Sequence, residues 1–267
     1  PLTAFRARLT DGLSSLYDVC YTVQQNGAWT PWVRNDEGTA GQEGSGLKIT
    51  GIRMTIVTKG AAIPGEKAAV QGIDPNRPMI ALTFDDGPHA PVTNRILDSL
   101  EANGGRATFF MVGNRVTGKA NKAAVARMAA LGCEVANHTY EHKAITKLGA
   151  EGIKSQLARA NDSIRLAGGV SPVLMRPPGG AKSDAAMKTV GSMGMSAVLW
   201  SIDTLDWKTK NKQKTIDAVI GHVKDGDIVL MHDLYGATAD AAEVIIPKLK
   251  EMGFQLVTVS ELASYRG

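Results

Sequence analysis

From Met79 onward, the chain repeats a short apolar run, a loop and a helical pattern. Strands that alternate with helices form parallel sheets with right-handed crossovers. Runs with the length and apolar character of buried strands cover 79–84, 107–112, 133–137, 173–176, 196–202, 227–232 and 254–259. So many repeats fit poorly in a small open sheet. The pattern therefore predicts an α/β fold built as a distorted or incomplete (β/α) barrel of about seven parallel strands.

The apolar residues between these runs recur at helical spacing, which is typical of the core face of a helix. One stripe, Ala124 to Leu131, stops at Gly132, and a second, Ile153 to Ile164, stops at Gly168-Gly169. A third stripe contains Val244, Ile245, Leu249 and Met252, and we expect Pro247 to kink its helix.

The first 60 residues have a different pattern, rich in Gly, with short alternating stretches such as Ile52, Met54 and Ile56. Period-two alternation bounded by Gly predicts a small all-β domain over residues 1–60. Residues 61–78 carry several Pro and Gly and are typical of a linker, so 79–267 forms the second domain.

Composition excludes several classes of protein. No stretch approaches the roughly 18 apolar residues of a membrane span, and the net charge of +4 comes with no basic cluster, so nucleic-acid binding is not indicated. The two cysteines, Cys20 and Cys133, exclude a disulfide framework and a Cys-based zinc site. The sequence starts at Pro1 without a signal-like stretch, and we expect any leader or anchor to lie outside it.

Polar residues follow five of the apolar runs, where parallel strands would end at one rim of the sheet. They are Asp85, Asp86, His138, His142, Arg176, Asp203, Asp206 and His232. Groups that bind metals or move protons would therefore meet in one site.

Two histidines four residues apart can lie on one side of a helical turn or fold inward from a loop. With a carboxylate from Asp86 they would form a three-ligand metal site with open positions, while Asp85 stays free to accept a proton. The same ligand set also serves non-haem iron oxygenases, and Asp85-Asp86-Gly87-Pro88 is good turn chemistry. The loop after Arg176 exposes backbone amides that could stabilise an oxyanion.

Residues 79–265 closely resemble the polysaccharide deacetylases of carbohydrate esterase family four, the NodB-like group, and in particular its bacterial peptidoglycan N-acetylglucosamine deacetylases. The resemblance runs through five motifs: Thr83-Phe84-Asp85-Asp86-Gly87, His138-Thr139-Tyr140-Glu141-His142, Arg176-Pro177-Pro178-Gly179, Asp203-Thr204-Leu205-Asp206-Trp207 and Leu230-Met231-His232.

The resemblance implies a divalent metal held by Asp86, His138 and His142, with Zn²⁺ the first choice and Co²⁺ another. It further implies that Asp85 is the general base and His232 the general acid. These residues would remove N-acetyl groups from N-acetylglucosamine units of peptidoglycan or of chitin oligomers. Removal of O-acetyl groups from xylan, or a wall-binding protein with an inactive domain, are the alternatives.

Supporting roles follow from the same resemblance. Arg176 would orient Asp85, Asp206 would belong to the same network, Trp207 and Leu230 would shape the acetyl pocket, and the amide of Gly179 would bind the oxyanion. The family usually carries Tyr where this chain has Gly179, so the groove loses one wall and substrate preference is open.

The N-terminal segment resembles the clostridial hydrophobic repeat known as ChW. Gly27-Ala28-Trp29, Trp32-Val33 and Gly38-Thr39-Ala40-Gly41 carry the resemblance, from which Thr50 and Gly51 depart. It implies a cell-wall or surface module, although the Trp residues would equally serve as the core of a small β unit. Together the two resemblances imply a bacterial protein that is extracellular or associated with the cell wall, with a polysaccharide substrate.

Overall fold

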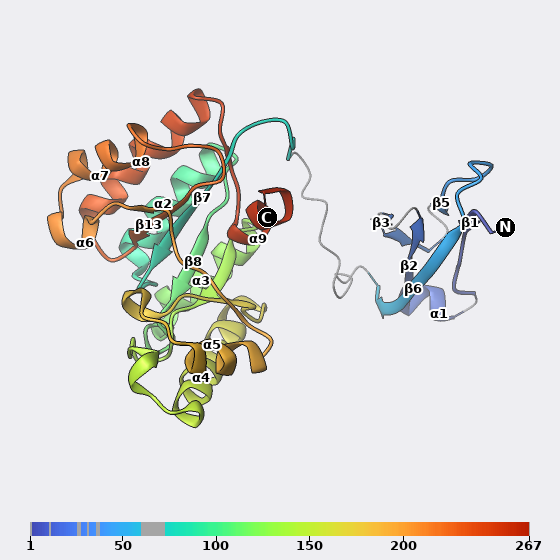
Figure 1. The fold of residues 1–267 in the computed structure, drawn as a ribbon, viewed down its shortest axis with the longest axis horizontal. Helices are drawn as coiled ribbons and strands as arrows, with labels where there is room; N and C mark the ends of the chain where they lie inside the picture. The colour runs from blue at the N-terminus through green and yellow to red at the C-terminus, as the bar shows by residue number, and fades with distance from the viewer. Residues whose placement is uncertain are drawn as a thin grey trace. The chain divides into compact units, whose positions relative to one another are not determined.

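The computed structural model describes residues 2–10, 12–25, 28–30, 32–35, 38–59 and 73–266. The chain divides into two compact units, Pro1–Ile73 and Asp74–Gly267 (Figure 1). Residues 61–72 of the predicted linker, and Gly27 of the N-terminal motif, lie outside the described residues. Asp74 belongs to the second unit, because its backbone N–H and C=O both bond the side chain of Gln255.

The N-terminal unit is built around one long strand, β2 (Tyr17–Gln25). It pairs antiparallel with β6 (Ile49–Thr58), β3 (Ala28–Trp29) and β4 (Val33–Arg34), and β1 (Ala4–Phe5) pairs with β5 (Ala40–Gly41). Tyr21, Val23 and Ala40 form its buried core. The expected small β unit is confirmed, with one short helix, α1 (Leu13–Leu16), added before β2.

The second unit contains a parallel sheet in the order β11-β10-β9-β8-β7-β13-β12, and β14 pairs with the start of β7. The strands are β7 (Met79–Asp85), β8 (Thr108–Met111), β9 (Glu134–Asn137), β10 (Leu174–Met175), β11 (Ser196–Ala197), β12 (Ile202–Asp203), β13 (Ile228–His232) and β14 (Gln255–Leu256). The expected incomplete barrel of parallel strands is confirmed.

One expected strand is wrong, because residues 196–202 form two short strands at opposite edges of the sheet. β11 pairs with β10, whereas β12 pairs with β13. Between them, the amide of Val198 bonds the carbonyl of Met175 and the amide of Ser201 bonds the carbonyl of Ile228. The segment therefore crosses the seam of the curled sheet. An apolar run shows that a segment is buried but not that it changes partners midway.

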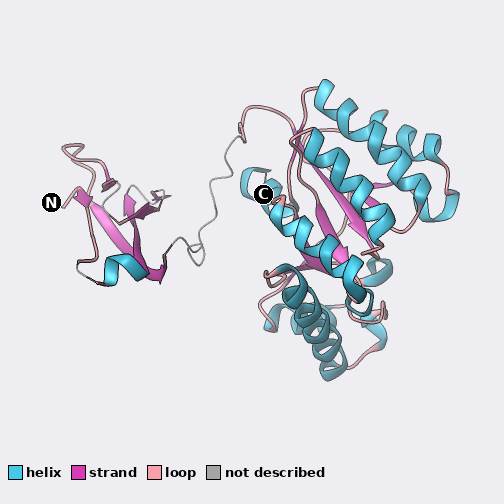
Figure 2. Cartoon of the chain, turned by 180° about the vertical axis from the view of Figure 1, so that it is seen from behind, coloured by secondary structure: helices cyan, strands magenta, loops and turns pink. Residues whose placement is uncertain are grey.

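Helices cover the sheet (Figure 2). They are α2 (Ala90–Ala102), α3 (Gly118–Ala130), α4 (Ala150–Gly168), α5 (Asp184–Ser192), α6 (Asp206–Thr209), α7 (Lys212–Ile220), α8 (Gly236–Glu251) and α9 (Val259–Arg266), with 3₁₀ turns η1 (Gly113–Arg115), η2 (Ile145–Lys147) and η3 (Pro178–Gly180). In Figure 1, α2, α7 and α8 lie together on one side, and α4 packs against α5 on the other. None of the described helices is long and apolar enough to cross a membrane.

Two of the three expected helical stripes are buried as expected, and the third is partly wrong. In α8, Ile245 and Leu249 are buried, but Val244 and Met252 are exposed. The buried face instead includes Ala241, Ala242 and Ile246. Alanine side chains contribute little hydrophobic signal, so the stripe expected from the sequence missed part of the buried face of the helix. The helix continues through Pro247.

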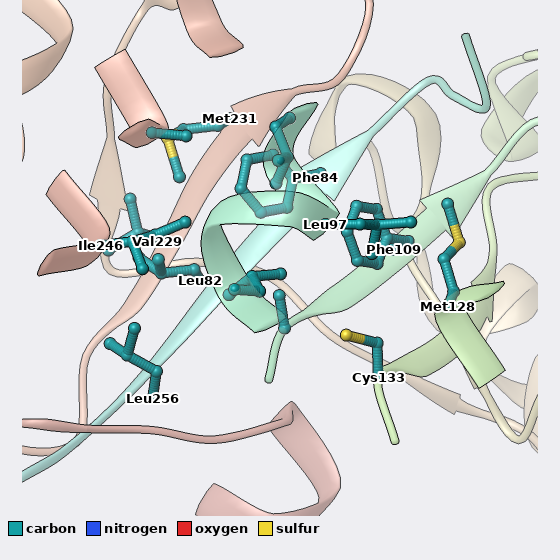
Figure 3. Close-up of a cluster of buried hydrophobic side chains, with 14 of the residues drawn as sticks. Leu82, Phe84, Leu97, Phe109, Met128, Cys133, Val229, Met231, Ile246 and Leu256 are labelled. Carbon is teal, nitrogen blue, oxygen red and sulfur yellow. The ribbon is translucent and has the colours of Figure 1, made fainter. Parts of the chain in front are cut away.

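The main core lies between the sheet and its helices (Figure 3). Phe84 of β7 stacks on Phe109 of β8 with ring centroids 5.1 Å apart. Cys133 is buried here, as expected for a structural thiol, and burial raises its pKa to about 11. Because the parallel strands run side by side in this core, their carboxyl ends deliver polar residues to one rim.

Candidate active site

Two carboxylates follow one another at the carboxyl end of β7, and both line the same pocket. Asp85 is the last residue of the strand and is buried, whereas Asp86 follows it with a φ of 75°. That left-handed backbone is unfavourable for a residue other than glycine, so it requires support from its surroundings. The support comes from Arg115, whose Nη1 donates to the carbonyl of Asp86 at 2.8 Å, and from the carbonyl of Phe110, which accepts the Asp86 amide at 3.1 Å.

Asp86, His138 and His142 bring three potential ligand atoms to within 4.8 Å of one another. Asp86 Oδ1 lies 3.1 Å from Nε2 of His142 and 3.5 Å from Nε2 of His138. The histidines lie in the loop after β9 rather than on a helix. Their spacing of four residues is compatible with either arrangement.

The electrostatics of these three residues suit a divalent cation. Burial raises the pKa of Asp86, but its close contact with His142 and the charges of His138 and His142 outweigh this effect and lower the pKa to about 2. Burial lowers the pKa of His138, which favours the neutral imidazole that binds metals. Asp86 Oδ1 is buried and accepts no hydrogen bond from the described residues. An orphaned carboxylate oxygen between two imidazole nitrogens fits a metal ion.

Arg176, directly after β10, is completely buried behind the pocket. Its Nη1 donates to Asp85 Oδ1 and to Thr83 Oγ1, both at 2.7 Å, and its Nη2 donates to the carbonyl of Leu199 at 2.9 Å. The guanidinium also lies 4.1 Å above the ring of Phe110. Arg176 therefore joins the end of β7 to the segment that crosses the sheet seam, and it fixes one oxygen of Asp85.

His232, the last residue of β13, forms a second charged pair with Asp206. The two side chains are 2.7 Å apart, between His232 Nδ1 and Asp206 Oδ1. Asp206 is itself held, because its Oδ2 accepts the amide of His232 at 2.8 Å and the hydroxyl of Thr238 at 2.6 Å. Burial lowers the pKa of His232, but the hydrogen bond and charge of Asp206 outweigh it, so the pKa is raised.

These groups line a pocket of about 320 Å³. Of the expected residues, the lining includes Asp85, Asp86, His138, His142, Gly179, Trp207, Leu230 and His232, while Arg176 and Asp206 stand behind it. Gly179 has a φ of 65°, and a Cβ built there would meet no atom within 4 Å. The pocket is therefore open at Gly179, as expected from the absence of the Tyr side chain that the family usually carries there.

Sequence reasoning assigned no role to several residues of this site. Trp200 and Tyr235 line the pocket, and Thr83 and Thr238 bond the buried carboxylates. Trp200 lies in an apolar run that predicts a strand, so the sequence did not single it out. Tyr235 follows His232 by three residues, and that proximity was the one signal that could have identified it.

Comparison with known proteins agrees with this geometry. Residues 72–198 match the family model described as polysaccharide deacetylase. The peptidoglycan-N-acetylmuramic acid deacetylase PdaC of Bacillus subtilis is 43% identical over 190 residues, which cover 71% of this chain and 40% of that protein. Its solved structure superposes with a TM-score of 0.68 at 43% identity, over 73% of this chain and 94% of the solved chain.

Two further similar proteins carry the names of other deacetylating enzymes. A peptidoglycan-N-acetylglucosamine deacetylase of Bacillus cereus is 37% identical over 72% of this chain and 91% of its own length. A family 4 acetyl xylan esterase of Clostridium thermocellum, solved with a cobalt ion, has a TM-score of 0.65 at 33% identity, over 70% of this chain and 90% of that one.

The chain spans about two fifths of the length of the B. subtilis PdaC protein and of the Listeria monocytogenes deacetylase PgdA. It covers nearly the whole of the B. cereus protein, however. The chain belongs to the polysaccharide deacetylase family.

Proposed function

We propose that this chain is a metal-dependent hydrolase that removes N-acetyl groups from N-acetylglucosamine units of peptidoglycan or of a related β-1,4 glycan such as a chitin oligomer. One observation carries the proposal: a three-ligand metal set, a carboxylate held by an arginine and a histidine held by an aspartate face the same pocket. The names of the family relatives supply the substrate class.

Asp86, His138 and His142 would hold the divalent metal, with Zn²⁺ favoured by two imidazoles and one carboxylate, and Co²⁺ compatible. The metal would supply Lewis acidity, which polarises the acetyl carbonyl and lowers the pKa of the attacking water.

Asp85 would act as the general base. One of its oxygens is bonded to Arg176, and the other, Oδ2, lies 3.8 Å from Nε2 of His138 and so faces the ligand set. The guanidinium of Arg176 holds Oδ1 of this carboxylate and leaves Oδ2 to accept a proton from water. Because both partners are buried, the orientation of this base is fixed before substrate arrives.

His232 would act as the general acid that protonates the leaving amine. Asp206 engages Nδ1, which leaves Nε2 to deliver the proton. The raised pKa keeps more of this imidazole protonated near neutral pH. The amide of Gly179 would help to stabilise the oxyanion, and Leu230 and Trp207 would enclose the acetyl methyl group.

The test is acetate release from three substrates: purified peptidoglycan, chitopentaose and acetylated xylan. Metal-depleted enzyme is reconstituted with Zn²⁺ or Co²⁺, and the Asp85→Asn variant serves as control. We expect metal-dependent release from the first two substrates. Preferential release from acetylxylan would instead identify an O-deacetylase. No release from any substrate, with Asp85→Asn indistinguishable from the parent protein, would contradict the proposal and support a wall-binding protein without activity.

The open position at Gly179 favours N-acetylmuramic acid as a second substrate sugar. The printed name of PdaC specifies this sugar for that relative. N-acetylmuramic acid carries a lactyl ether on C3, next to the acetamido carbon, and therefore needs more room beside the reacting group. Because a side chain at Gly179 would extend into otherwise free space, its absence provides such room. Mass spectrometry of digested glycan strands after reaction shows which of the two sugars has lost its acetyl group.

For the N-terminal unit we propose attachment to the bacterial cell wall, which would place the enzyme outside the cell or in the wall. The support is its small all-β build, its ChW-like sequence and the peptidoglycan named for the relatives of the other unit. Co-sedimentation of the full chain with purified walls tests the attachment, and a protein that stays in the supernatant would contradict it.

A further inference from the structure

The two histidines of the metal set are held in different ways. The ring of His138 is buried, and its Nδ1 lies 2.8 Å from the carbonyl of Arg176. The side chain of His142 is 45% exposed, and its only polar contact among the described residues is with Asp86 Oδ1. The orientation of His142 therefore depends on the backbone that carries it.

That backbone is unfavourable in two places. Thr139 has a φ of 63° and His142 a φ of 56°, and both are β-branched or bulky residues in the left-handed region. Each such residue costs on the order of a few RT unless the surroundings impose it. The loop 139–142 should therefore relax if its supports are removed.

The support comes from both sides of the loop. On one side, the amides of Gly113 and Asn114 donate to the carbonyls of Thr139 and Tyr140, each at 3.0 Å. On the other side, Oε1 of Gln156 accepts the amides of Tyr140 at 3.1 Å and of Glu141 at 2.9 Å. A single side-chain oxygen thus holds two of the three peptide N–H groups between the two histidines, and Asn137 Oδ1 accepts the third, that of Thr139, at 2.7 Å.

Gln156 is itself well placed for this task. It lies on the buried face of α4, where the other buried residues are Ile153, Leu157, Ala160 and Ile164. Its Nε2 donates to Glu141 Oε2 at 2.8 Å, so both ends of the amide are satisfied. One turn further along α4, Arg159 lies 3.8 Å above the ring of Tyr140. The loop is therefore fastened to α4, a rigid element outside the pocket.

We propose that Gln156 is a positioning residue that sets the metal affinity of this site by holding the loop of His142. The inference rests on the proposed metal role of Asp86, His138 and His142, and it extends that role to a helix that touches neither metal nor substrate. Residues that orient metal ligands in this indirect way typically change metal affinity by about 10- to 100-fold when they are substituted.

The first test is Gln156→Met, which keeps the length of the side chain and removes the acceptor. We expect metal affinity to fall about 10- to 100-fold, measured by competition with a chromophoric chelator for Zn²⁺ and by the absorption spectrum of bound Co²⁺. Gln213→Met is the matched control, because Gln213 is exposed on α7 and bonds only Asp217 in the same helix. It should bind metal like the parent protein.

The second test separates positioning from general stability. Gln156→Glu keeps the acceptor oxygens but places a carboxylate against Glu141, and we expect weaker metal binding. Adding Glu141→Gln restores a donor opposite that carboxylate and should recover the affinity. A purely structural role would instead lower the thermal stability of the metal-free protein and leave the affinity of each folded variant unchanged.

Parental affinity in Gln156→Met, or no recovery in the double variant, would overturn the inference. If the parent protein binds metal tightly but releases no acetate, only the proposed function is contradicted. The inference about Gln156 stands, because metal affinity is measured independently of turnover.

Discussion

The inner wall and the rim of the pocket are built differently. On the inner wall, Asp85, Arg176 and His138 are each at most 3% exposed, and every charged group has a partner. On the rim, His142 and Trp207 are nearly half exposed, and Gly179 borders open space. The inner wall consists of strand ends and of the segment that crosses the sheet seam, whereas the rim consists of a loop, the 3₁₀ turn η3 and the short helix α6.

This difference indicates which side chains need a fixed orientation for catalysis. A buried charged pair is costly to desolvate and is worth retaining only where orientation matters. The proposed base has such a pair, and its partner also ties the strands together. Trp207 and the open position at Gly179 would meet substrate at the rim, so substitutions there should change binding more than chemistry.

The largest effect should come from Asp85→Asn, on the inner wall. An amide cannot accept the proton from water, so we expect kcat to fall about 10²- to 10⁴-fold. Metal content, measured by mass spectrometry, should stay at the parental level, because Asp86 and the two histidines provide the ligand set. A variant that loses its metal along with its activity would instead mean that Asp85 is a ligand.

Asp206→Asn should have an intermediate effect with a distinct pH signature. Burial lowers the pKa of His232, while the hydrogen bond and charge of Asp206 raise it further than burial lowers it. Without that charge, the pKa falls and the acid loses its proton at lower pH. We expect kcat near neutral pH to drop roughly 10- to 100-fold and the alkaline limb of the profile to move to lower pH. An unmoved limb would assign it to another group.

The inner wall was largely predictable from sequence, for a physical reason. Asp85, Arg176 and His232 each follow an apolar run, and parallel strands necessarily end at one rim. The supporting residues were harder to recognise. Gln156 stands inside an apolar helical stripe, where its neighbours suggest core packing, and its hydrogen bonds reach a loop 15 or 16 residues away. Nothing local in the sequence encodes that contact.

The fold shows the same limit. The periodic strands and the helices α3 and α4 were predictable, because each repeats one pattern over many residues. The split of 196–202 was not, because the change of partner from β10 to β13 depends on how far the sheet curls. Curvature arises from the packing of the whole sheet, so a local apolar run carries no record of it.

At the rim, Gly179→Tyr should change substrate choice more than rate. A ring at this position would extend into the space that we propose for the lactyl group of N-acetylmuramic acid. We expect the ratio of activity on N-acetylmuramic acid residues to activity on N-acetylglucosamine residues to fall about tenfold. Gly179→Ala is the control, because it imposes the same backbone strain at a φ of 65° without the ring. Equal losses in both variants would trace the effect to strain.

The smallest effect should come from Trp207→Ala. Its ring lines the pocket but is 47% exposed, so it provides contact area for the sugar without being fixed in the core. Its backbone amide donates to Asp206 Oδ1, and that hydrogen bond survives the substitution. We expect KM for chitopentaose to rise about threefold with little change in kcat. Leu205→Ala, directly before α6 and outside the pocket lining, should leave both constants unchanged. If Trp207→Ala instead lowered kcat as strongly as Asp206→Asn, the ring would help to hold the catalytic groups, and the division between inner wall and rim would fail at this residue.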